Sequence, residues 1–540
     1  MPHLLKRAIA LMLVLTGFFC ATGRAQNLDT IGVTLLQSVT TNLNGMGIRV
    51  AQPEADFDLG TNWEVNPGVA GRLAGLFTYT SGNGSTNVFP NSLSSESGHA
   101  DGVAQFFYGI PNGVATNAAH VDNYDADYFY NNIIAAVSPP NINDPVVNQS
   151  FIFGNVSTNI PTPTNYLSVS DQQQIDSDYD NYASHFKTLF VSGAGNSGPV
   201  CPVATCYNGI GVAAYGGSSS FGPTLDNGRA KPDITAPAGV TSSSTPQVAG
   251  AAAVLIQAGL RGDGGGDTNS AADIRTVKAF LLNGAIKPAD WTNNAPSPLD
   301  SRYGAGVLNV FNSYQQLVGG KHGYIVSTTV SAGGAHPPTG ATGTVGVLSG
   351  WDFNTNSSSA TTDGVNHYYF NATNGANNAA FTATITLVWN RPQSQTPQIQ
   401  SGINNLDLFL YNAANGNLVA CSTSLVDNVE HIFIPCLPQG RYDLQVWKAG
   451  GLNTVSFSET YALAWAFVAP TLSIAKSATN VALTWPIYPA GFRVEAATNL
   501  VSPVWSTNNL SSPVITNSLN SLMLNATNAQ QFFRLRQPDF

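Results

Sequence analysis

A short polar stretch that leads into an apolar run holds the residues best placed for chemistry. Residues 239–256 read G-V-T-S-S-S-T-P-Q-V-A-G-A-A-A-V-L-I. The small and apolar residues predict a helix that is buried on all sides, and Pro246 suits its first turn. Ser242 is then expected just before the helix, where the helix dipole favours developing negative charge. The alternative is a Ser/Thr-rich cap on an ordinary core helix.

The pattern T-S-x-x-x-P-x-V-A-G around Ser242 resembles the nucleophile motif of the subtilisin-like serine proteases, the subtilases. In that family an acid, a histidine and a serine follow one another along the chain and act together. Residues 47–56, G-I-R-V-A-Q-P-E-A-D, resemble the strand that ends in the family's acid. The resemblance implies Glu54 as this acid, although the family uses Asp there. Asp56 and Asp58 are close alternatives.

Two blocks between the acid and the serine extend the resemblance. Residues 97–109, S-G-H-A-D-G-V-A-Q-F-F-Y-G, resemble the family block H-G-T-H-V-A-G, which implies His99 as the general base. Residues 189–199, L-F-V-S-G-A-G-N-S-G-P, join an apolar run typical of a buried strand to a Gly-rich turn. They resemble the block A-G-N-x-G, which implies Asn196 as the side-chain donor to the oxyanion.

Three further residues are implied as parts of a substrate cleft. Residues 146–154 predict a strand with a polar interruption. In subtilases the comparable strand lines the cleft, which implies Ser150 and Gly154 as substrate-binding residues, with Gly193 from the Gly-rich turn. An extended peptide would pair with the exposed edge of this strand. The alternative is a plain core strand.

The resemblance covers roughly residues 40–320 and so predicts the fold of this part. It includes K-P-D-I-T-A-P at 231–237, which comes unusually close to the serine, so that one wall of the cleft is in question. The alternation of strand and helix patterns predicts an α/β fold with a parallel sheet, and the resemblance implies a three-layer, subtilisin-like arrangement. We expect this peptidase domain at residues 26–320.

The rest of the chain predicts all-β structure. Apolar residues alternate, so that Leu406, Leu408 and Leu410 share one face of a strand. The pattern predicts a jelly-roll-like β-sandwich domain at 321–468, followed by a small fibronectin-like β-domain at 469–540. The first of these is expected to pack on the peptidase domain or to bind a polymer or substrate.

Composition and the N-terminus indicate where the protein acts. The chain has 540 residues, a formal charge of −10 and only 10% charged residues, which argues against a nucleic-acid partner. Residues 1–25 predict a signal peptide, with a basic start, a short apolar run and small residues before the cleavage site. No later segment is apolar enough for a membrane span. We therefore expect a secreted, extracellular protein.

Four cysteines remain after the signal peptide is removed, and they form two close pairs. Cys201 and Cys206 form one pair, and Cys421 and Cys436 form the other. An oxidising compartment permits a disulfide in each pair, and neither pair has the spacing of metal ligands. No cofactor or metal is predicted for the chemistry. Calcium often stabilises subtilases, but no clear acidic loop for it is present.

These features together predict a secreted serine endopeptidase that acts on polypeptides through Ser242, His99 and Glu54. The main alternative is a secreted binding or adhesion protein built on an inactive protease fold, which the Glu in place of Asp favours. A Ser–Glu–Asp peptidase of the sedolisin type is a third hypothesis, and His99 argues against it. The sequence leaves the cleavage preference and the oligomeric state open.

Overall fold

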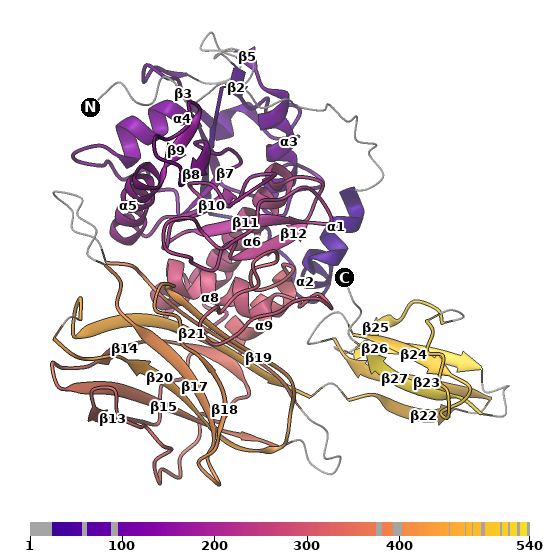
Figure 1. Ribbon diagram of the computed structural model, residues 1–540. Coiled ribbons are helices and arrows are strands. Elements are labelled where there is room, and N and C mark those ends of the chain that lie inside the picture. The colour runs from indigo at the N-terminus through magenta and orange to yellow at the C-terminus, as the bar shows by residue number, and fades with distance from the viewer. Residues whose placement is uncertain are drawn as a thin grey trace.

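Figure 1 shows the computed structural model of the chain. The structure describes residues 24–56, 62–87, 95–373, 381–392, 402–452, 454–469, 471–477, 479–487, 492–507, 510–516, 519–525 and 530–536. Most of the predicted signal peptide and Asp58 lie outside the described residues. Helix α1 (Arg24–Thr30) begins at the end of that predicted segment.

A parallel sheet forms the centre of the N-terminal part of the molecule. Its parallel strands are buried along most of their length, as expected when helices cover both faces. All neighbouring strands are parallel except β4, which pairs antiparallel with β3 at one edge. The predicted parallel α/β fold is therefore confirmed. Within the described residues the order across the sheet is β12 (Ile234–Pro237), β11 (Ile210–Tyr215), β10 (Leu189–Gly193), β7 (Val146–Gln149), β1 (Arg49–Glu54), β6 (His120–Asp125), β3 (Phe77–Thr80) and β4 (Thr86–Asn87).

Helices lie on both faces of this sheet, as the side chains of β10 show. Phe190 packs edge-to-face on Tyr179 of α5, with the ring centroids 4.9 Å apart. Gly193 lies on the opposite face, where an added side chain would meet Thr245 of α6. The other helices and short strands of this part are α2 (Val33–Val39), α3 (Gly98–Phe107), α4 (Ala126–Tyr128), α5 (Val169–Phe186), α6 (Thr241–Arg261), α7 (Thr268–Ala271), α8 (Ile274–Gly284), α9 (Val310–Val318), β2 (Asn62–Glu64), β5 (Ser95–Glu96), β8 (Asn155–Ser157) and β9 (Tyr166–Ser168).

Helix α6 is the buried helix that the sequence predicts, and α3 packs directly against it. Its side chains are buried on all sides from Ser244 to Gly259. A Cβ atom at Gly250 would lie only 2.6 Å from the Cβ of Val114 and 3.2 Å from the carbonyl oxygen of Phe107, at the end of α3. The absence of a side chain at Gly250 therefore lets the α3 segment approach α6 closely.

An antiparallel β-sandwich follows, drawn in pink to orange in Figure 1. The predicted inward face is confirmed, because Leu406, Leu408 and Leu410 are all fully buried in the core between its sheets. One sheet has the order β13 (Val326–Ser331), β15 (Thr362–Ala372), β20 (Gly440–Lys448), β17 (Leu406–Asn412) and β18 (Leu418–Ser422). The other has the order β14 (Ser349–Ser357), β21 (Ser458–Val468), β16 (Phe381–Trp389) and β19 (Val429–Leu437).

The second sheet of the sandwich is buried on both faces because α8 and α9 cover its outer side. Ala462, Ala464 and Val388 on that side belong to the same apolar core as the helices around the parallel sheet. Phe280 of α8 packs edge-to-face on Trp351 of β14, with the ring centroids 5.8 Å apart. The sandwich thus packs on the parallel-sheet region through apolar contacts, which is one of the two roles expected for it.

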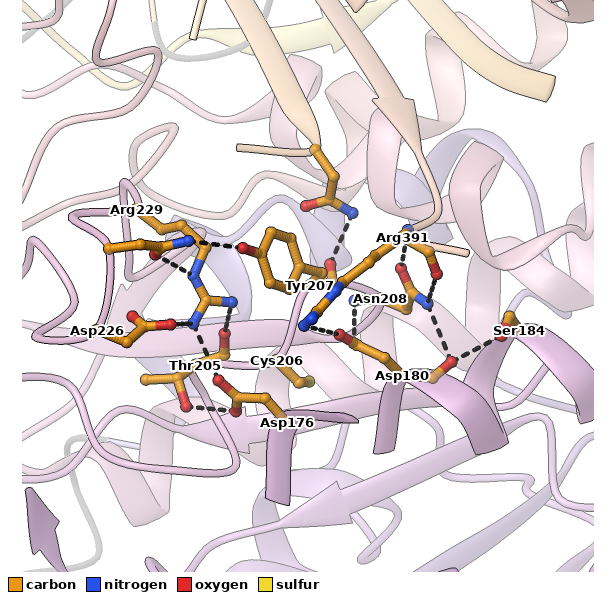
Figure 2. Close-up of polar contacts among 12 residues, drawn as sticks. Asp176, Asp180, Ser184, Thr205, Cys206, Tyr207, Asn208, Asp226, Arg229 and Arg391 are labelled. Carbon is orange, nitrogen blue, oxygen red and sulfur yellow. Dashed lines mark hydrogen bonds and ion pairs between the residues drawn. The ribbon is translucent and has the colours of Figure 1, made fainter. Parts of the chain in front are cut away.

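A second, polar contact joins the same two regions (Figure 2). The amide of Asn208 exchanges two hydrogen bonds with the backbone of Arg391, of 2.8 and 3.1 Å. The Arg391 guanidinium lies 3.6 Å from the Asp180 carboxylate and over the ring of Tyr207. Arg229 also lies over the Tyr207 ring, with its Cζ atom 4.0 Å from the centroid. One aromatic ring therefore contacts guanidinium groups from both regions.

The C-terminal strands form a small β-structure with its own core, drawn in yellow in Figure 1. The buried centre consists of Leu483, Trp485, Val494 and Leu522. One sheet has the order β22 (Ser473–Ser477), β23 (Asn480–Pro486), β26 (Leu519–Asn525) and β25 (Val514–Thr516), and β24 (Arg493–Ala497) pairs with β27 (Phe532–Arg536). Among the described residues, all-β structure after α9 is confirmed, and the predicted domain limits at 320 and 468 stay predictions.

The candidate disulfides are absent, since the four cysteines in the described residues are free thiols. Cys421 belongs to β18 and Cys436 to β19, and these strands lie in different sheets of the sandwich. Cys201 contacts the side chain of Asn155, whereas Cys206 is buried beside Gly209. The two cysteines of each pair are close in sequence, but they lie among different neighbouring residues.

Candidate active site

The predicted site residues come from the ends of neighbouring parallel strands and from two helix starts. The carboxyl ends of parallel strands meet at one edge of a sheet, which is where α/β folds hold their ligands. Glu54 is the last residue of β1, His99 is the second residue of α3, Ser150 follows β7, Asn196 follows β10, and Ser242 is the second residue of α6.

The acid and the histidine are in direct contact. His99 Nδ1 lies 2.9 Å from Glu54 Oε2. The Glu54 side chain is only 1% exposed, whereas that of His99 is 28% exposed. The hydroxyl of Ser97 caps α3 by accepting the N–H of Ala100, which fixes the helix start that carries His99. Because an ionised carboxylate accepts the Nδ1 proton, Nε2 is the ring nitrogen left to act as a base.

The electrostatics of this pair favour a charged imidazole. Burial works against the imidazolium, but the Glu54 carboxylate and its hydrogen bond outweigh burial, so the pKa of His99 is raised above 6.5. Asp101 is the other acid near Glu54, and burial raises its pKa to about 7. The pair is therefore arranged to stabilise a proton that His99 takes up.

The other two candidate acids are not at the imidazole. Asp56 lies near Asp125 and Asp127, and burial followed by their negative charges raises its pKa to about 6. Asp58 falls outside the described residues. Of the three acids considered from the sequence, Glu54 is the one for which the structure records a contact with His99.

Two residues that hold Glu54 were not singled out from the sequence. Gln52 Nε2 donates to Glu54 Oε1 over 2.8 Å, and the hydroxyl of Tyr108 donates to Gln52 Oε1 over 2.6 Å. Both side chains are fully buried. The available signal was a polar residue two positions before Glu54 in a buried strand, since such residues point to the same face.

Ser242 differs from the sequence prediction, because it lies inside the helix and not before it. Helix α6 begins at Thr241, so Pro246 falls in the second turn. Pro246 has no N–H to give to the carbonyl oxygen of Ser242 four residues earlier. The hydroxyl of Ser150 donates to that oxygen instead, over 3.2 Å. A side chain from a neighbouring strand thus allows the helix to start earlier than Pro246 suggests.

The Ser242 side chain is held in the same reciprocal contact. Its hydroxyl donates to the carbonyl oxygen of Ser150 over 3.3 Å, and the residue is half-buried. The backbone N–H of Ser242 belongs to the first turn of α6, where amides have no acceptor within the helix. This end of α6 therefore presents a hydroxyl and an N–H donor next to each other.

Asn196 is oriented by the residue before the serine. Its Oδ1 atom accepts hydrogen bonds from both the N–H and the hydroxyl of Thr241, each 2.9 Å long. Since two donors fix the oxygen, the NH2 end of the amide must point away from Thr241. Asn196 thus caps α6 from outside the helix and keeps a side-chain donor beside its first turn.

The three predicted substrate-binding residues have different surroundings. Ser150 is buried against Ser242, as described above. Gly193 is buried beneath α6, where an added side chain would meet Thr241 and Thr245. Gly154 is half-buried in the segment between β7 and β8, with φ at +147°, a backbone conformation that favours glycine. Their roles in substrate binding stay predictions.

The described part of the chain has neither a cluster of metal-ligating side chains nor a helix that could span a membrane. Within this part, no group of three or more His, Cys, Asp and Glu side chains is arranged to hold a metal ion. None of the described helices combines the length and the apolar character needed to cross a bilayer.

Comparison with known proteins gives one family match within the chain. Residues 79–306 match the model of the Subtilase family, which includes His99, Asn196 and Ser242 but begins after Glu54. A comparison with curated proteins finds no match.

Among solved structures, tripeptidyl peptidase 2 is 12% identical over 76% of this chain and 44% of its own, with a TM-score of 0.31. A β-1,2-glucanase from Parabacteroides distasonis is 11% identical over 34% of this chain and 31% of its own (TM-score 0.16). Dimeric latent PorU from Porphyromonas gingivalis is 7% identical over 38% and 22% (TM-score 0.14). The chain thus spans less than half the length of each of these proteins. Residues 79–306 are thus similar to the subtilases in sequence, and antiparallel β-sheets follow that region.

Proposed function

We propose that the protein is a secreted serine endopeptidase that hydrolyses peptide bonds in polypeptide substrates. Ser242 is the nucleophile, His99 the general base and then acid, and Glu54 the carboxylate that orients the imidazole. Asn196 and the N–H of Ser242 donate hydrogen bonds to the oxyanion. The observation that carries the proposal is the 2.9 Å contact between His99 Nδ1 and the buried Glu54 carboxylate, at the sheet edge where α6 begins.

The reaction follows from these groups. His99 Nε2 takes the hydroxyl proton of Ser242 as Oγ bonds to the substrate carbonyl carbon, and the carbonyl oxygen becomes an oxyanion. The imidazolium then gives the proton to the leaving amine as the peptide bond breaks. Water attacks the acyl-enzyme in the same way, which releases the acid and restores the serine. Neutral donors at the start of α6 stabilise the oxyanion because they act where its charge develops.

One adjustment must precede attack. The Ser242 hydroxyl donates to the Ser150 carbonyl, so its proton has to be redirected toward His99. Rotation about χ1 or displacement by the bound peptide would do this, since a hydroxyl rotates to suit its partners. The segment after β7 would then be free to pair with the substrate backbone.

Secretion is part of the proposal. Residues 1–25 have the pattern of a signal peptide, and only 10% of the residues are charged. Sequencing the N-terminus of protein recovered from the culture medium tests this. A first residue near Gln26 supports secretion and cleavage, and an uncleaved intracellular chain contradicts both.

The activity is tested with a fluorophosphonate probe, which labels activated serines, together with casein hydrolysis. We expect labelling of the wild type and its loss in Ser242→Ala and His99→Ala, because each removes one half of the proton transfer. Ser243→Ala, a neighbouring serine in the same turn of α6, is the matched control and should keep both labelling and activity. A wild type that neither reacts nor cleaves casein would support an inactive protease fold that serves in binding.

A further inference from the structure

The carboxylate proposed for the triad has two contacts, one on each oxygen. Oε2 faces His99, and Oε1 accepts the Gln52 side-chain amide at 2.8 Å. Gln52 Nε2 donates a second bond, of 3.0 Å, to the carbonyl oxygen of Ala100 in α3. Gln52 therefore ties the end of β1 to the helix that carries His99.

The orientation of the Gln52 amide follows from its neighbours. The Glu54 carboxylate and the Ala100 carbonyl are acceptors, so only the nitrogen end of the amide can face them. The oxygen end accepts the hydroxyl of Tyr108, at 2.6 Å. Burial raises the pKa of Tyr108 well above 10, so its hydroxyl stays protonated and remains a donor. Tyr108 thus fixes which end of the amide meets Glu54.

A glutamate needs such a contact more than an aspartate does. It has one more rotatable bond between the backbone and the carboxylate, and each free rotor spreads the carboxylate over more positions. Small displacements of a reacting or orienting group reduce turnover steeply. Gln52 and Tyr108 are both fully buried, so no solvent competes for these hydrogen bonds.

We propose that Gln52, oriented by Tyr108, is the positioning residue that holds the Glu54 carboxylate against His99. This inference rests on the proposed peptidase activity. It adds an explanation of how a glutamate, with its longer side chain, is held in the position of the triad acid. A neutral amide suits the task because it restrains the carboxylate and leaves its negative charge for the imidazolium, whereas a cation in that place would reduce the charge. No role in touching substrate is assigned to either residue.

The test compares three variants of the full chain with the wild type. Gln52→Met keeps a similar shape but removes the amide, and Tyr108→Phe removes one hydroxyl. Gln316→Met is the control, since Gln316 of α9 is a buried glutamine that accepts the amide of Asn283 away from the site. For each, kcat and KM for a peptide substrate are measured against pH, with the melting temperature and the far-downfield proton signal of His99 Nδ1–H.

We expect Gln52→Met to lower kcat on the order of 10²-fold, with KM nearly unchanged. Its downfield signal should weaken, and the acid limb of kcat should move to lower pH, because a loosened Glu54 raises the pKa of His99 less. Glu54 is the charged group that acts on His99, and Asp101 of α3 is the acid that Glu54 in turn affects. Tyr108→Phe should shift the same quantities in the same direction by less, and Gln316→Met should lower only the melting temperature.

Unchanged kcat and an unchanged acid limb in Gln52→Met would overturn the inference. So would a loss of kcat that follows the melting temperature alone and leaves the downfield signal intact. If Gln52→Met does not fold, Tyr108→Phe decides by the same criteria. A wild type without peptidase activity contradicts the proposed function itself, which the labelling experiment detects separately.

Discussion

Buried carboxylates occur at several places in the described residues, and two of these places balance the negative charge in different ways. Where the parallel-sheet region meets the sandwich, Asp176 contacts Arg229 at 2.9 Å and Asp180 lies 3.6 Å from Arg391 (Figure 2). At the candidate active site, Glu54 meets a neutral amide and an imidazole instead. A guanidinium stays charged at every accessible pH, whereas an imidazole gains and loses its charge near neutrality.

The difference separates a structural use of charge from a chemical one. Burial raises the pKa of Asp180 to about 6 even though Arg391 acts against it. Removing one partner from such a buried pair leaves a charge that nothing compensates. At Glu54, by contrast, the positive partner is expected to appear only when His99 accepts a proton. Mutations at the two places should therefore change different properties. Mutations of the buried arginine pairs should lower stability, and mutations around Glu54 should lower turnover.

The largest expected effect is on turnover at the active site. Glu54→Gln removes the orienting charge with almost no change in shape, and we expect kcat/KM to fall by about 10⁴-fold, as when the acid of such a triad is neutralised. Steady-state kinetics on a peptide substrate measures this, and at alkaline pH, where His99 is neutral, the melting temperature should change little. Near-normal turnover would mean that Asp56 or Asp58 serves as the acid.

The next largest effect is on protein stability, where the parallel-sheet region meets the sandwich. Arg229 is 1% exposed and contacts both Asp176 and Asp226, so Arg229→Met should lower the free energy of unfolding by about 3–5 kcal/mol. Denaturant titration gives this value, while labelling of the folded fraction should persist. The control is Arg302→Met, which breaks the pair with Asp290 on the surface and should cost less than about 1 kcal/mol. Equal losses of unfolding free energy in both variants would contradict a structural role for the buried arginine pair.

The smallest effect is a shift in pH dependence. His99 must be neutral to accept the serine proton, and its pKa is raised above 6.5, so kcat/KM should rise with pH through a midpoint above 6.5. In Glu54→Gln the raising influence is gone and burial remains, so the residual activity should have its midpoint below 6.5. A pH series on both proteins measures the two limbs. A midpoint that does not move would mean that Glu54 does not control His99.

The contact between His99 and Glu54 should also make the folding stability depend on pH. Because the folded-state pKa of His99 is raised, the stability gained from its charged form is fully present below the ordinary value of 6.5. It is lost as the pH rises through the raised value. The stability difference between the wild type and Glu54→Gln should therefore shrink from slightly acidic to alkaline pH.

Local patterns carried most of what could be predicted. Ser242 lies at the start of a recognisable apolar helix, and His99 and Asn196 lie in short blocks with their own small residues, so sequence patterns single them out as candidates. Glu54 is a candidate because the strand that ends there resembles the acid-bearing strand of subtilases, and its catalytic role stays a prediction. The parallel sheet and the later β-strands also follow from local periodicity, and both are present in the structure.

Long-range partners explain what was missed. Gln52 has no motif, and its partner Tyr108 is 56 positions away. The start of α6 was placed too late because the hydroxyl that replaces the missing N–H of Pro246 comes from Ser150, 92 positions before Ser242. The candidate disulfides were inferred from spacing along the chain, yet Cys421 and Cys436 belong to different sheets.

The position of β1 has a practical consequence for anyone who divides this protein. Strand β1 lies between β7 and β6 in the middle of the sheet, but the family match begins only at residue 79. A fragment cut to the matched range would lose a central strand together with Glu54 and Gln52. It would leave two unpaired strand edges in its interior, which is a known route to aggregation, so recombinant work should keep the segment that precedes the match.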